Sequence, residues 1–352
     1  MSEVTPSHYG SAAYQAGDIP LMPAPQRKRE RVGEELLPFG DYAGIDPYQQ
    51  LCEDSEFVQH QDSLDKAFYK TNDWWWDHQR IRFLESKMGV TALLLLLPYV
   101  CAVALLAFVV YIGIELTFFL DPVIGGWAIL AGMIFFVLGV TFIFVVMPYV
   151  SRFTMSGAIW LVTPLHKYFS HQGQRYMESR QSELNRQTGL ASFAQGKKTP
   201  PLVAPFIEFD GYVERVVQRG GIFYRLMFVH RYTGKQFSQT SLSTIVDHKH
   251  EVHALWDMLQ RYMDVSQPMP DVPRLEPFRH LDPTTAEHDQ KTGREPRYWR
   301  DLDLEEWKKG DGAAHLKAQM EYPWSRQRCQ LTPQLGKVEM ATYRERQQAA
   351  EA

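Results

Sequence analysis

The sequence predicts a protein that combines one transmembrane helical hairpin with a small cytoplasmic α+β domain. The runs 89–114 and 122–150 contain no Lys, Arg, Asp, Glu or His. Each run exceeds the about 20 residues with which a helix crosses a hydrocarbon core about 30 Å thick. Between 203 and 243, β-branched and aromatic residues alternate with polar ones, which is typical of half-buried strands. These patterns together predict two membrane-spanning helices followed by a sheet.

The segment before the first span is expected to contain little structure of its own. Residues 1–53 are expected to be disordered, because prolines recur and few apolar residues are available for burial. Residues 54–88 are expected to form a cytoplasmic juxtamembrane helix, since apolar side chains recur at helical intervals from Phe57 to Trp75. The end of this helix, 80–88, is expected to lead directly into the first span.

Within the hairpin, 89–150, the short segment 115–121 is expected to form the turn between the spans. Backbone N–H and C=O groups find no water inside a bilayer, so each span is expected to be helical. Gly132 and Gly139 give the second span a small face on which another helix can pack closely. Because neither span contains a charge, a proton relay or an ion-coupled transporter is not expected.

Positive residues flank the hairpin on one side only. The turn 115–121 has no Lys or Arg, whereas cations stand before the first span and after the second. Because positive residues stay cytoplasmic, both termini are expected in the cytoplasm. The three consecutive tryptophans fit a membrane interface and a protein contact equally well. The residues expected at the membrane interface are Trp74, Trp75, Trp76, Arg80, Arg82, Lys87, Arg152 and Trp160.

The chain after the second span is expected to contain a linker and then a sheet. Residues 151–200 are expected to be a cytoplasmic helical extension and linker, which Gly and Pro end. The domain 201–300 is expected to begin with a β-hairpin, 203–218 and 222–232, joined by the glycine-containing turn 219–221.

A third strand, 236–243, and one amphipathic helix are expected to complete the sheet. This order of elements resembles the pleckstrin-homology-like modules that some bacterial membrane proteins carry beside their spans. The resemblance implies an antiparallel sheet capped by one helix. Residues 269–299 are expected to lie on the sheet as an extended proline-rich strap, and 301–352 to be a loose charged tail. The expected anchors of the strap are Leu275, Phe278, Leu281, Tyr298 and Trp299.

The side chains that carry chemistry are scattered. His248, His250 and His253 are the only ligand-like cluster, and they fit the polar start of the predicted helix at least as well as a metal site. His280, Asp282, His288 and Asp289 have no spacing that fixes an acid–base geometry. No phosphate-binding loop and no GxSxG, HExxH or CxxC motif occurs, so we expect no enzyme, cofactor or metal.

The composition argues against nucleic acid as a partner and against a disulfide or metal framework. The net charge of −4 gives no basic field for nucleic acid. Cys52, Cys101 and Cys329 form neither a disulfide framework nor a metal pattern, as is usual in a reducing compartment.

The stretch 271–299 contains two distinctive short motifs, LDPTT at 281–285 and RYW at 297–299, the latter followed by a further Arg. It resembles a family of uncharacterised two-span bacterial inner-membrane proteins associated with type VI secretion toxin and immunity gene clusters. The resemblance covers about 74–299. It implies a Gram-negative inner membrane and a role as an immunity protein or secretion accessory, and it transfers no catalytic residue.

The function expected is therefore that of a non-enzymatic inner-membrane protein that presents a cytoplasmic protein-binding domain. Its expected partners are the lipid bilayer and a toxin or secretion-apparatus protein, with a homo-oligomer through the spans as a further option. Two alternatives remain open: a delivered toxin that permeabilises membranes, and a lipid- or stress-sensing regulator. The candidate partner-binding residues are Arg219, Arg225, Arg231, Tyr298 and Trp299.

Overall fold

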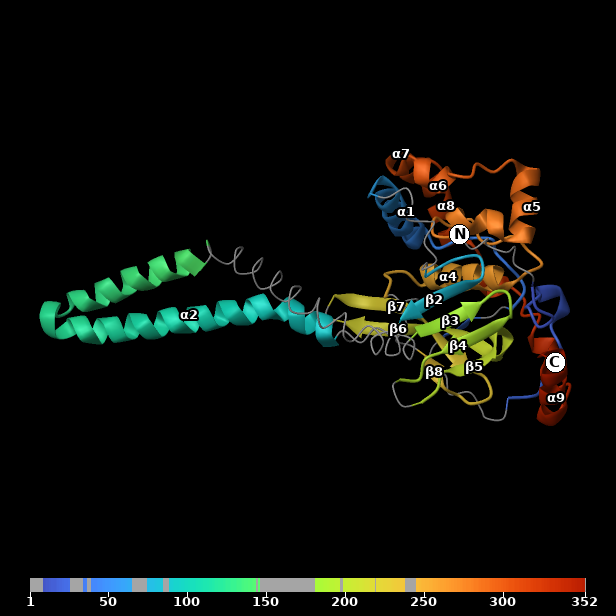
Figure 1. Ribbon diagram of the computed structural model, residues 1–352, viewed down its shortest axis with the longest axis horizontal. Helices are drawn as coiled ribbons and strands as arrows, with labels where there is room; N and C mark the ends of the chain where they lie inside the picture. Colours follow the sequence, from blue (N-terminus) through green and yellow to red (C-terminus); the bar gives the residue numbers. More distant parts are fainter. Residues whose placement is uncertain are drawn as a thin grey trace, which may run out of the picture. The chain divides into compact units, whose positions relative to one another are not determined.

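The computed structural model describes residues 9–25, 34–36, 39–64, 75–84, 89–143, 145, 181–196, 199–218, 220–237 and 245–351. The chain divides into two compact units. Unit 1 combines Met1–Ser86 with Glu178–Ala352, and unit 2 is Lys87–Met177. Unit 1 is a mixed α+β fold with antiparallel sheets, and the described residues of unit 2 are helical (Figure 1).

Unit 1 contains two four-stranded antiparallel sheets. The first has the order β2-β3-β4-β5, with β2 Arg80–Leu84, β3 Gln181–Asn185, β4 Leu190–Phe193 and β5 Leu202–Pro205. The second has the order β1-β6-β7-β8, with β1 Glu34–Leu36, β6 Phe209–Gln218, β7 Gly221–His230 and β8 Gln236–Phe237. Buried and half-buried residues alternate along β3 and β4, so one face of the first sheet lies on the core.

Aromatic side chains from both sheets meet in one core. The ring centroid of Phe193 in β4 lies 4.8 Å from that of Phe209 in β6 and 4.6 Å from that of Phe237 in β8. The two sheets therefore bury their inner faces against each other. The expected hairpin is confirmed for β6 and β7, which are joined through Gly220. The start of the expected strand 203–218 is corrected, because 203–205 belong to β5 of the first sheet and Phe206–Glu208 form a 3₁₀ turn.

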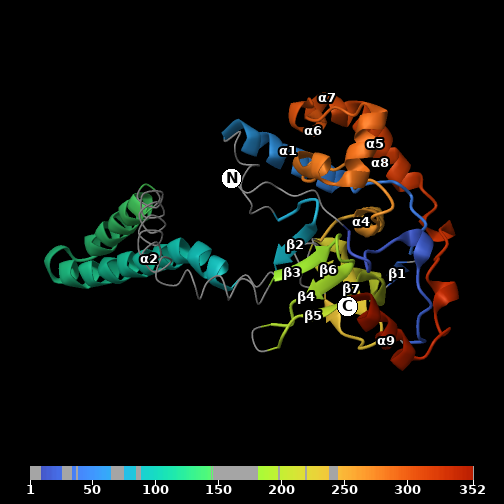
Figure 2. The ribbon, with the colours of Figure 1, turned by 45° about the vertical axis from the view of Figure 1, so that its right-hand side comes forward.

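Helix α4, Lys249–Met263, covers the strands, as the apolar spacing of its residues predicts. Its Trp256 is fully buried and lies against Gly211 of β6, where a Cβ would stand 2.9 Å from Trp256 Cδ2. Glycine at this position therefore permits the close packing of helix on sheet. Figure 2 shows α4 between the strands and two further helices, α1 (Tyr48–Leu64) and α8 (Asp311–Glu321).

The C-terminal part is helical and packed, which corrects two expectations. The segment 269–299 is not extended, because it contains η4 (Glu276–Leu281) and α5 (Pro283–Thr292). Proline lies in the first turn of both, where its missing N–H is no loss, so the prolines begin helices rather than prevent them. Of the five expected anchors, Leu275, Phe278 and Trp299 are buried.

Residues 301–351 are not a loose tail. They begin at the end of α6 (Tyr298–Asp301) and form α7 (Leu304–Lys309), α8 and α9 (Met340–Glu351), with short 3₁₀ turns between them. Buried aromatic side chains attach these helices to the core of unit 1, and they include Trp307, Trp324 and Tyr343.

The expectation of disorder is wrong for the described residues between 9 and 53. Tyr14, Met22 and Phe39 are buried in the core of unit 1. The backbone of Met22 exchanges hydrogen bonds with the far C-terminal part, since its N–H donates to Gln334 O at 2.9 Å and its carbonyl accepts from Lys337 N–H at 3.1 Å. A segment poor in apolar residues is ordered here because distant parts of the chain cover the few that it has.

The expected helix 54–88 is correct only in part. Helix α1 ends at Leu64, and the segment that was expected to lead into the membrane contains β2. Residues 181–185, expected to be linker, form β3. These two strands pair with each other along their whole length, from Arg80↔Asn185 to Leu84↔Gln181. The alternation of Arg80 and Arg82 with the buried Ile81 and Phe83 is the period-two signal of a strand.

Unit 2 is a helical hairpin whose turn lies later than expected. Helix α2 runs without interruption over Gly89–Ile124, so Glu115 and Asp121 lie within it. The chain turns at Gly125, which has φ 56° and donates to Asp121 O at 2.9 Å. A glycine accepts this left-handed backbone, and the pair of charges does not end the helix.

The return helix, Trp127–Ile143, packs closely on α2 through small residues, as expected. Gly132 lies against Thr117, and Gly139 lies against Val109. Within the described residues, one helix, Ala102–Ile124, is long and apolar enough to cross a membrane, and the return helix is a shorter apolar helix.

Candidate functional site

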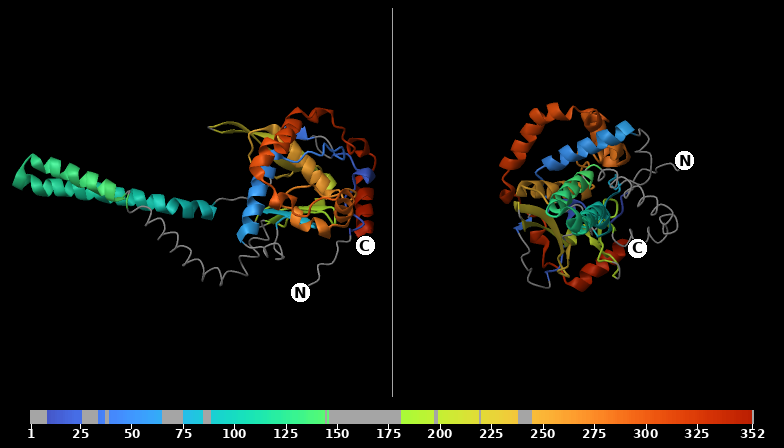
Figure 3. Two further views of the ribbon diagram at one scale, coloured as in Figure 1. Left: turned by 90° about the horizontal axis from the view of Figure 1, so that it is seen from above. Right: turned by 90° about the vertical axis from the view of Figure 1, so that its left-hand side faces the viewer.

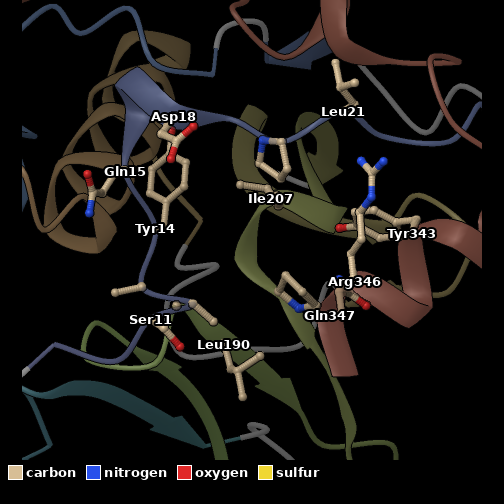
Figure 4. Close-up of a pocket in the computed structure, with 15 residues that line it drawn as sticks. Ser11, Tyr14, Gln15, Asp18, Leu21, Leu190, Ile207, Tyr343, Arg346 and Gln347 are labelled. Carbon is tan, nitrogen blue, oxygen red and sulfur yellow. The ribbon is translucent and has the colours of Figure 1, made fainter. Parts of the chain in front are cut away.

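A cavity of about 290 Å³ lies in unit 1 between the N-terminal segment, the turn from β3 to β4 and helix α9. Tyr14, Gln15 and Asp18 come from the first segment, and Tyr343, Arg346 and Gln347 come from α9. Figure 4 shows these two groups facing each other, with Ile207 between them. The site thus combines residues from opposite ends of the chain.

The wall formed by the N-terminal segment is fixed by backbone contacts. Gly10 N–H donates to Gln187 O at 2.8 Å, and Val265 N–H donates to Tyr14 O at 3.0 Å. Gly189 has φ 71°, and a Cβ there would stand 2.5 Å from Ala12 O. Only a glycine in the β3–β4 turn therefore lets the N-terminal segment cross it.

Helix α9 is held by a buried carboxylate. Glu208 is fully buried and accepts hydrogen bonds from Arg344 at 2.8 and 2.9 Å, from Gln347 Nε2 at 3.0 Å and, at 3.1 Å, from His230 Nε2. Burial alone would raise the pKa of Glu208, but these donors outweigh it and lower the pKa to about 2. The ionised carboxylate therefore ties α9 to the second sheet at neutral pH.

The cavity is lined by hydroxyl, amide and charged groups that can form hydrogen bonds. Burial raises the pKa of both Tyr14 and Tyr343 well above its usual value, so both hydroxyls stay neutral. Asp18 and Arg346 supply one charge of each sign at the exposed rim. No imidazole, thiol or amine is found among the described side chains that line it. The arrangement suits a short polar segment that offers hydrogen bonds and a carboxylate to Arg346.

Within the histidine cluster, the position of His253 is set by its packing in the fold. His253 is buried and stacks on Trp324 with ring centroids 5.4 Å apart. The rings of His250 and His253 are 6.4 Å apart. In the part of the chain that the structure describes, no group of three or more His, Cys, Asp or Glu residues is arranged to hold a metal ion.

The expected membrane-interface residues divide into three groups. Trp76 is buried, with the guanidinium of Arg274 5.5 Å from its ring, so it is a core residue. Trp75 is 38% exposed, and Arg82 lies 5.9 Å from its ring. Arg80 pairs with Glu183 at 3.7 Å. Trp74, Lys87, Arg152 and Trp160 lie outside the described residues.

Most of the expected partner-binding residues are occupied within the fold. Arg231 is buried and pairs with Asp210 at 2.6 Å, and Arg225 pairs with Glu214. Trp299 is buried too, and its indole N–H donates to Asp271 Oδ1 at 3.0 Å. Tyr298 is half-buried, and Arg219 lies outside the described residues. Arg231 and Trp299 are therefore corrected from surface residues to core residues.

The acid–base group of the sequence is also structural. Asp282 is fully buried and accepts a hydrogen bond from Arg186 Nε at 3.0 Å. Asp289 accepts one from Arg279 at 2.6 Å. His288 Nδ1 lies 3.4 Å from Asp289 Oδ1, but its side chain is exposed and the carboxylate is already held by Arg279.

Sequence reasoning missed the cavity because no local pattern marks it. Its walls come from the first 21 residues, the β3–β4 turn and the last helix, and only the fold brings them together.

Comparisons of the chain with protein-family models, with curated proteins and with solved structures gave no match.

Proposed function

We propose that the chain is a membrane-anchored binding protein, in which unit 2 crosses a membrane as a hairpin and unit 1 stays on one face. The observation that carries this proposal is the register of β2 and β3. Leu84, where the chain leaves unit 1, is the direct partner of Gln181, where it returns. Opposed residues of antiparallel strands lie about 5 Å apart. An apolar insertion that starts and ends at one point must cross a membrane an even number of times.

The length of α2 agrees with one crossing, and the return helix, Trp127–Ile143, is a shorter apolar helix. At about 1.5 Å per residue, the uncharged part of α2, 89–114, is about 39 Å long and exceeds the about 30 Å of a hydrocarbon core. Glu115 and Asp121 then lie near the Gly125 turn, where the helix reaches the opposite surface. Arg80 and Arg82 lie on the strand that leads to the helix, which favours a cytoplasmic unit 1 and cytoplasmic termini.

For unit 1 we propose a pleckstrin-homology-like plan with the apolar unit inserted in its first hairpin. The support is the order of elements: strands β2 to β5 form one meander, β6 to β8 form a second, and α4 follows and covers them. In this proposal β1 is an added strand beside β6.

For the partner, we propose a type VI secretion toxin or a component of the secretion apparatus, with this chain as immunity or accessory protein. The support is the resemblance of 271–299. Residues of its two short motifs stabilise the fold. Asp282 caps α5 and pairs with Arg186, and Trp299 N–H donates to Glu276 at 2.7 Å. The resemblance therefore supports a shared fold, and the cavity beside α9 is the proposed seat for a segment of the partner.

The membrane topology is tested by labelling single cysteines from each face of sealed vesicles, in a background that lacks Cys52, Cys101 and Cys329. Gly17→Cys and Lys317→Cys report on unit 1, because both positions are exposed. Gly126→Cys reports on the turn. The proposal predicts that an impermeant maleimide labels the first two from one face and Gly126→Cys from the other. Labelling of Gly17→Cys and Lys317→Cys from opposite faces would overturn it.

The partner is tested by co-purification of the tagged full chain from detergent-solubilised native membranes. The expected result is a near-stoichiometric toxin or secretion component that Arg346→Glu loses and that Lys317→Glu, an exposed position outside the cavity, retains. If Arg346→Glu retains the partner, the cavity is not its seat.

A further inference from the structure

The β6–β7 hairpin is longer than the core that it helps to form. Its first half is buried, whereas the second half, from Glu214 to Gln218 and from Gly221 to Arg225, is half-buried or exposed where described. At about 3.3 Å per residue, this end of the hairpin is about 16 Å long. The left view of Figure 3 shows it projecting from unit 1.

The tip carries apolar side chains on both of its faces. Val217 is 74% exposed and its direct partner Ile222 is 44% exposed, so they lie together on one face. Val216 and its partner Phe223 lie on the other face and are half-buried. Beyond Tyr224, whose backbone pairs with Val246, apolar side chains lie on both faces of the hairpin, and those of Val217 and Ile222 are exposed. Such an exposed group normally marks a contact with a membrane or with another protein.

The charged neighbours of the tip favour a lipid surface. Arg215 is exposed two residues before Val217, on the same face. Glu214, the nearest carboxylate on the strand, is neutralised by its ion pair with Arg225. The tip therefore offers apolar side chains next to a cation, which is the combination that binds anionic headgroups and the acyl boundary beneath them.

The tip lies at the end of unit 1 from which the chain leaves for the apolar unit. In Figure 1 the arrowhead of β2 points to the side on which β6 and β7 extend farthest. The segment 85–88 joins Leu84 to α2, so Gly89 lies within about 18 Å of Leu84 at about 3.6 Å per residue. The reach of this linker and the length of the projecting hairpin are therefore similar.

We propose that the tip of the β6–β7 hairpin inserts into the headgroup region of the membrane that holds unit 2, as a second contact of unit 1 with the bilayer. This inference rests on the proposed membrane anchorage. It assigns a role to Val217, Ile222 and Arg215 that the fold itself does not require.

The test uses the full chain in anionic phospholipid vesicles, with an environment-sensitive fluorophore on one cysteine in the background without Cys52, Cys101 and Cys329. Gly220→Cys places the fluorophore at the tip, where a Cβ meets only Phe223 at ordinary distance. Gly17→Cys is the matched control, because it is exposed, its Cβ meets nothing, and its segment crosses the β3–β4 turn. That turn is at the opposite end of the first sheet from Leu84.

The proposal predicts a blue shift at Gly220→Cys and loss of its emission to spin-labelled lipid, with neither effect at Gly17→Cys. Val217→Glu is expected to abolish both effects while the urea midpoint stays unchanged, since the side chain is 74% exposed and its new carboxylate lies on the same face as Arg215. If the emission at Gly220→Cys is not shifted and the protein resists carbonate extraction, the tip does not insert, although unit 2 still anchors the protein. A shifted tip that spin-labelled lipid does not quench lies on protein, which also overturns the insertion. Release of the protein by carbonate overturns the anchorage itself.

Discussion

Arg186 shows how unit 1 accommodates charge in its interior. Its guanidinium is fully buried and donates to both oxygens of Asp282, at 3.0 and 3.3 Å. It also donates to the carbonyls of Asp264 at 2.9 Å and Gln267 at 2.7 Å. These bonds join the end of β3, the end of α4 and the start of α5. A buried ion pair of this kind costs desolvation, but removal of one partner costs more, because the other charge is left unpaired.

Asp282→Ala is therefore expected to destabilise unit 1 by about 3–5 kcal/mol. The variant removes the partner of Arg186 and the cap that accepts from Thr285 N–H at 3.1 Å. Urea unfolding of the full chain in detergent, followed by tryptophan fluorescence, measures the loss. Asp282→Asn keeps a cap and should recover part of it, and Glu345→Ala, at an exposed position, should change nothing. Wild-type stability in Asp282→Ala would mean that the pair does not hold the fold.

The pH dependence of stability is expected to report on His253. Burial, followed by the charges of Lys249 and His250, lowers the pKa of His253 from about 6.5 to about 4. Because His253 binds a proton more tightly in the unfolded chain than in the folded chain, the free energy of unfolding is highest above about pH 6.5. It falls as the pH drops to about 4, by about 3 kcal/mol.

His253→Phe keeps an aromatic ring on Trp324 and removes the titrating group. Urea midpoints between pH 7 and 4 should therefore fall less in this variant than in the wild type. His60→Phe, at an exposed position in α1, is the matched control and should keep the wild-type slope. Equal slopes in all three proteins would show that His253 is not buried neutral.

At the scale of elements, local patterns predicted what local sequence specifies. The β6–β7 hairpin follows from a glycine turn between alternating strands, and α4 follows from apolar residues at helical spacing. The pairing of β2 with β3 could not be predicted in the same way, since the whole of unit 2 separates them. Charge misled the interpretation of Arg231, which looks like a surface residue until Asp210 is found beside it.

The packing of α4 on the second sheet is expected to depend on Gly211. A Cβ at this position would stand 2.9 Å from Trp256, which is fully buried and cannot move freely. Gly211→Ala is expected to destabilise the protein by about 1–3 kcal/mol, as overpacking does. Gly17→Ala is the control in open space and should be neutral or slightly stabilising. An equal urea midpoint for both variants would mean that Trp256 does not rest on Gly211.

At the scale of the whole molecule, the main result is that a continuous core is built from a discontinuous chain. The N-terminal segment, both sheets and the C-terminal helices share one core, and the apolar unit is inserted between two paired strands. The sequence predicted the apolar hairpin and a sheet, but it assigned 1–53 to disorder and 301–352 to a loose charged tail. The contacts that order them, such as Met22 with Gln334, join residues far apart in the chain.

Unit 1 is expected to be complete without unit 2, and excision of unit 2 tests this most directly. Replacing 85–180 by Asn-Gly joins Leu84 to its partner Gln181 through a two-residue turn of the type that antiparallel strands favour. The excised protein is expected to leave the membrane fraction, remain soluble and unfold in urea with one cooperative transition. The full chain should meanwhile resist carbonate extraction. An excised protein that shows no cooperative transition, or that stays carbonate-resistant in membranes, would contradict it.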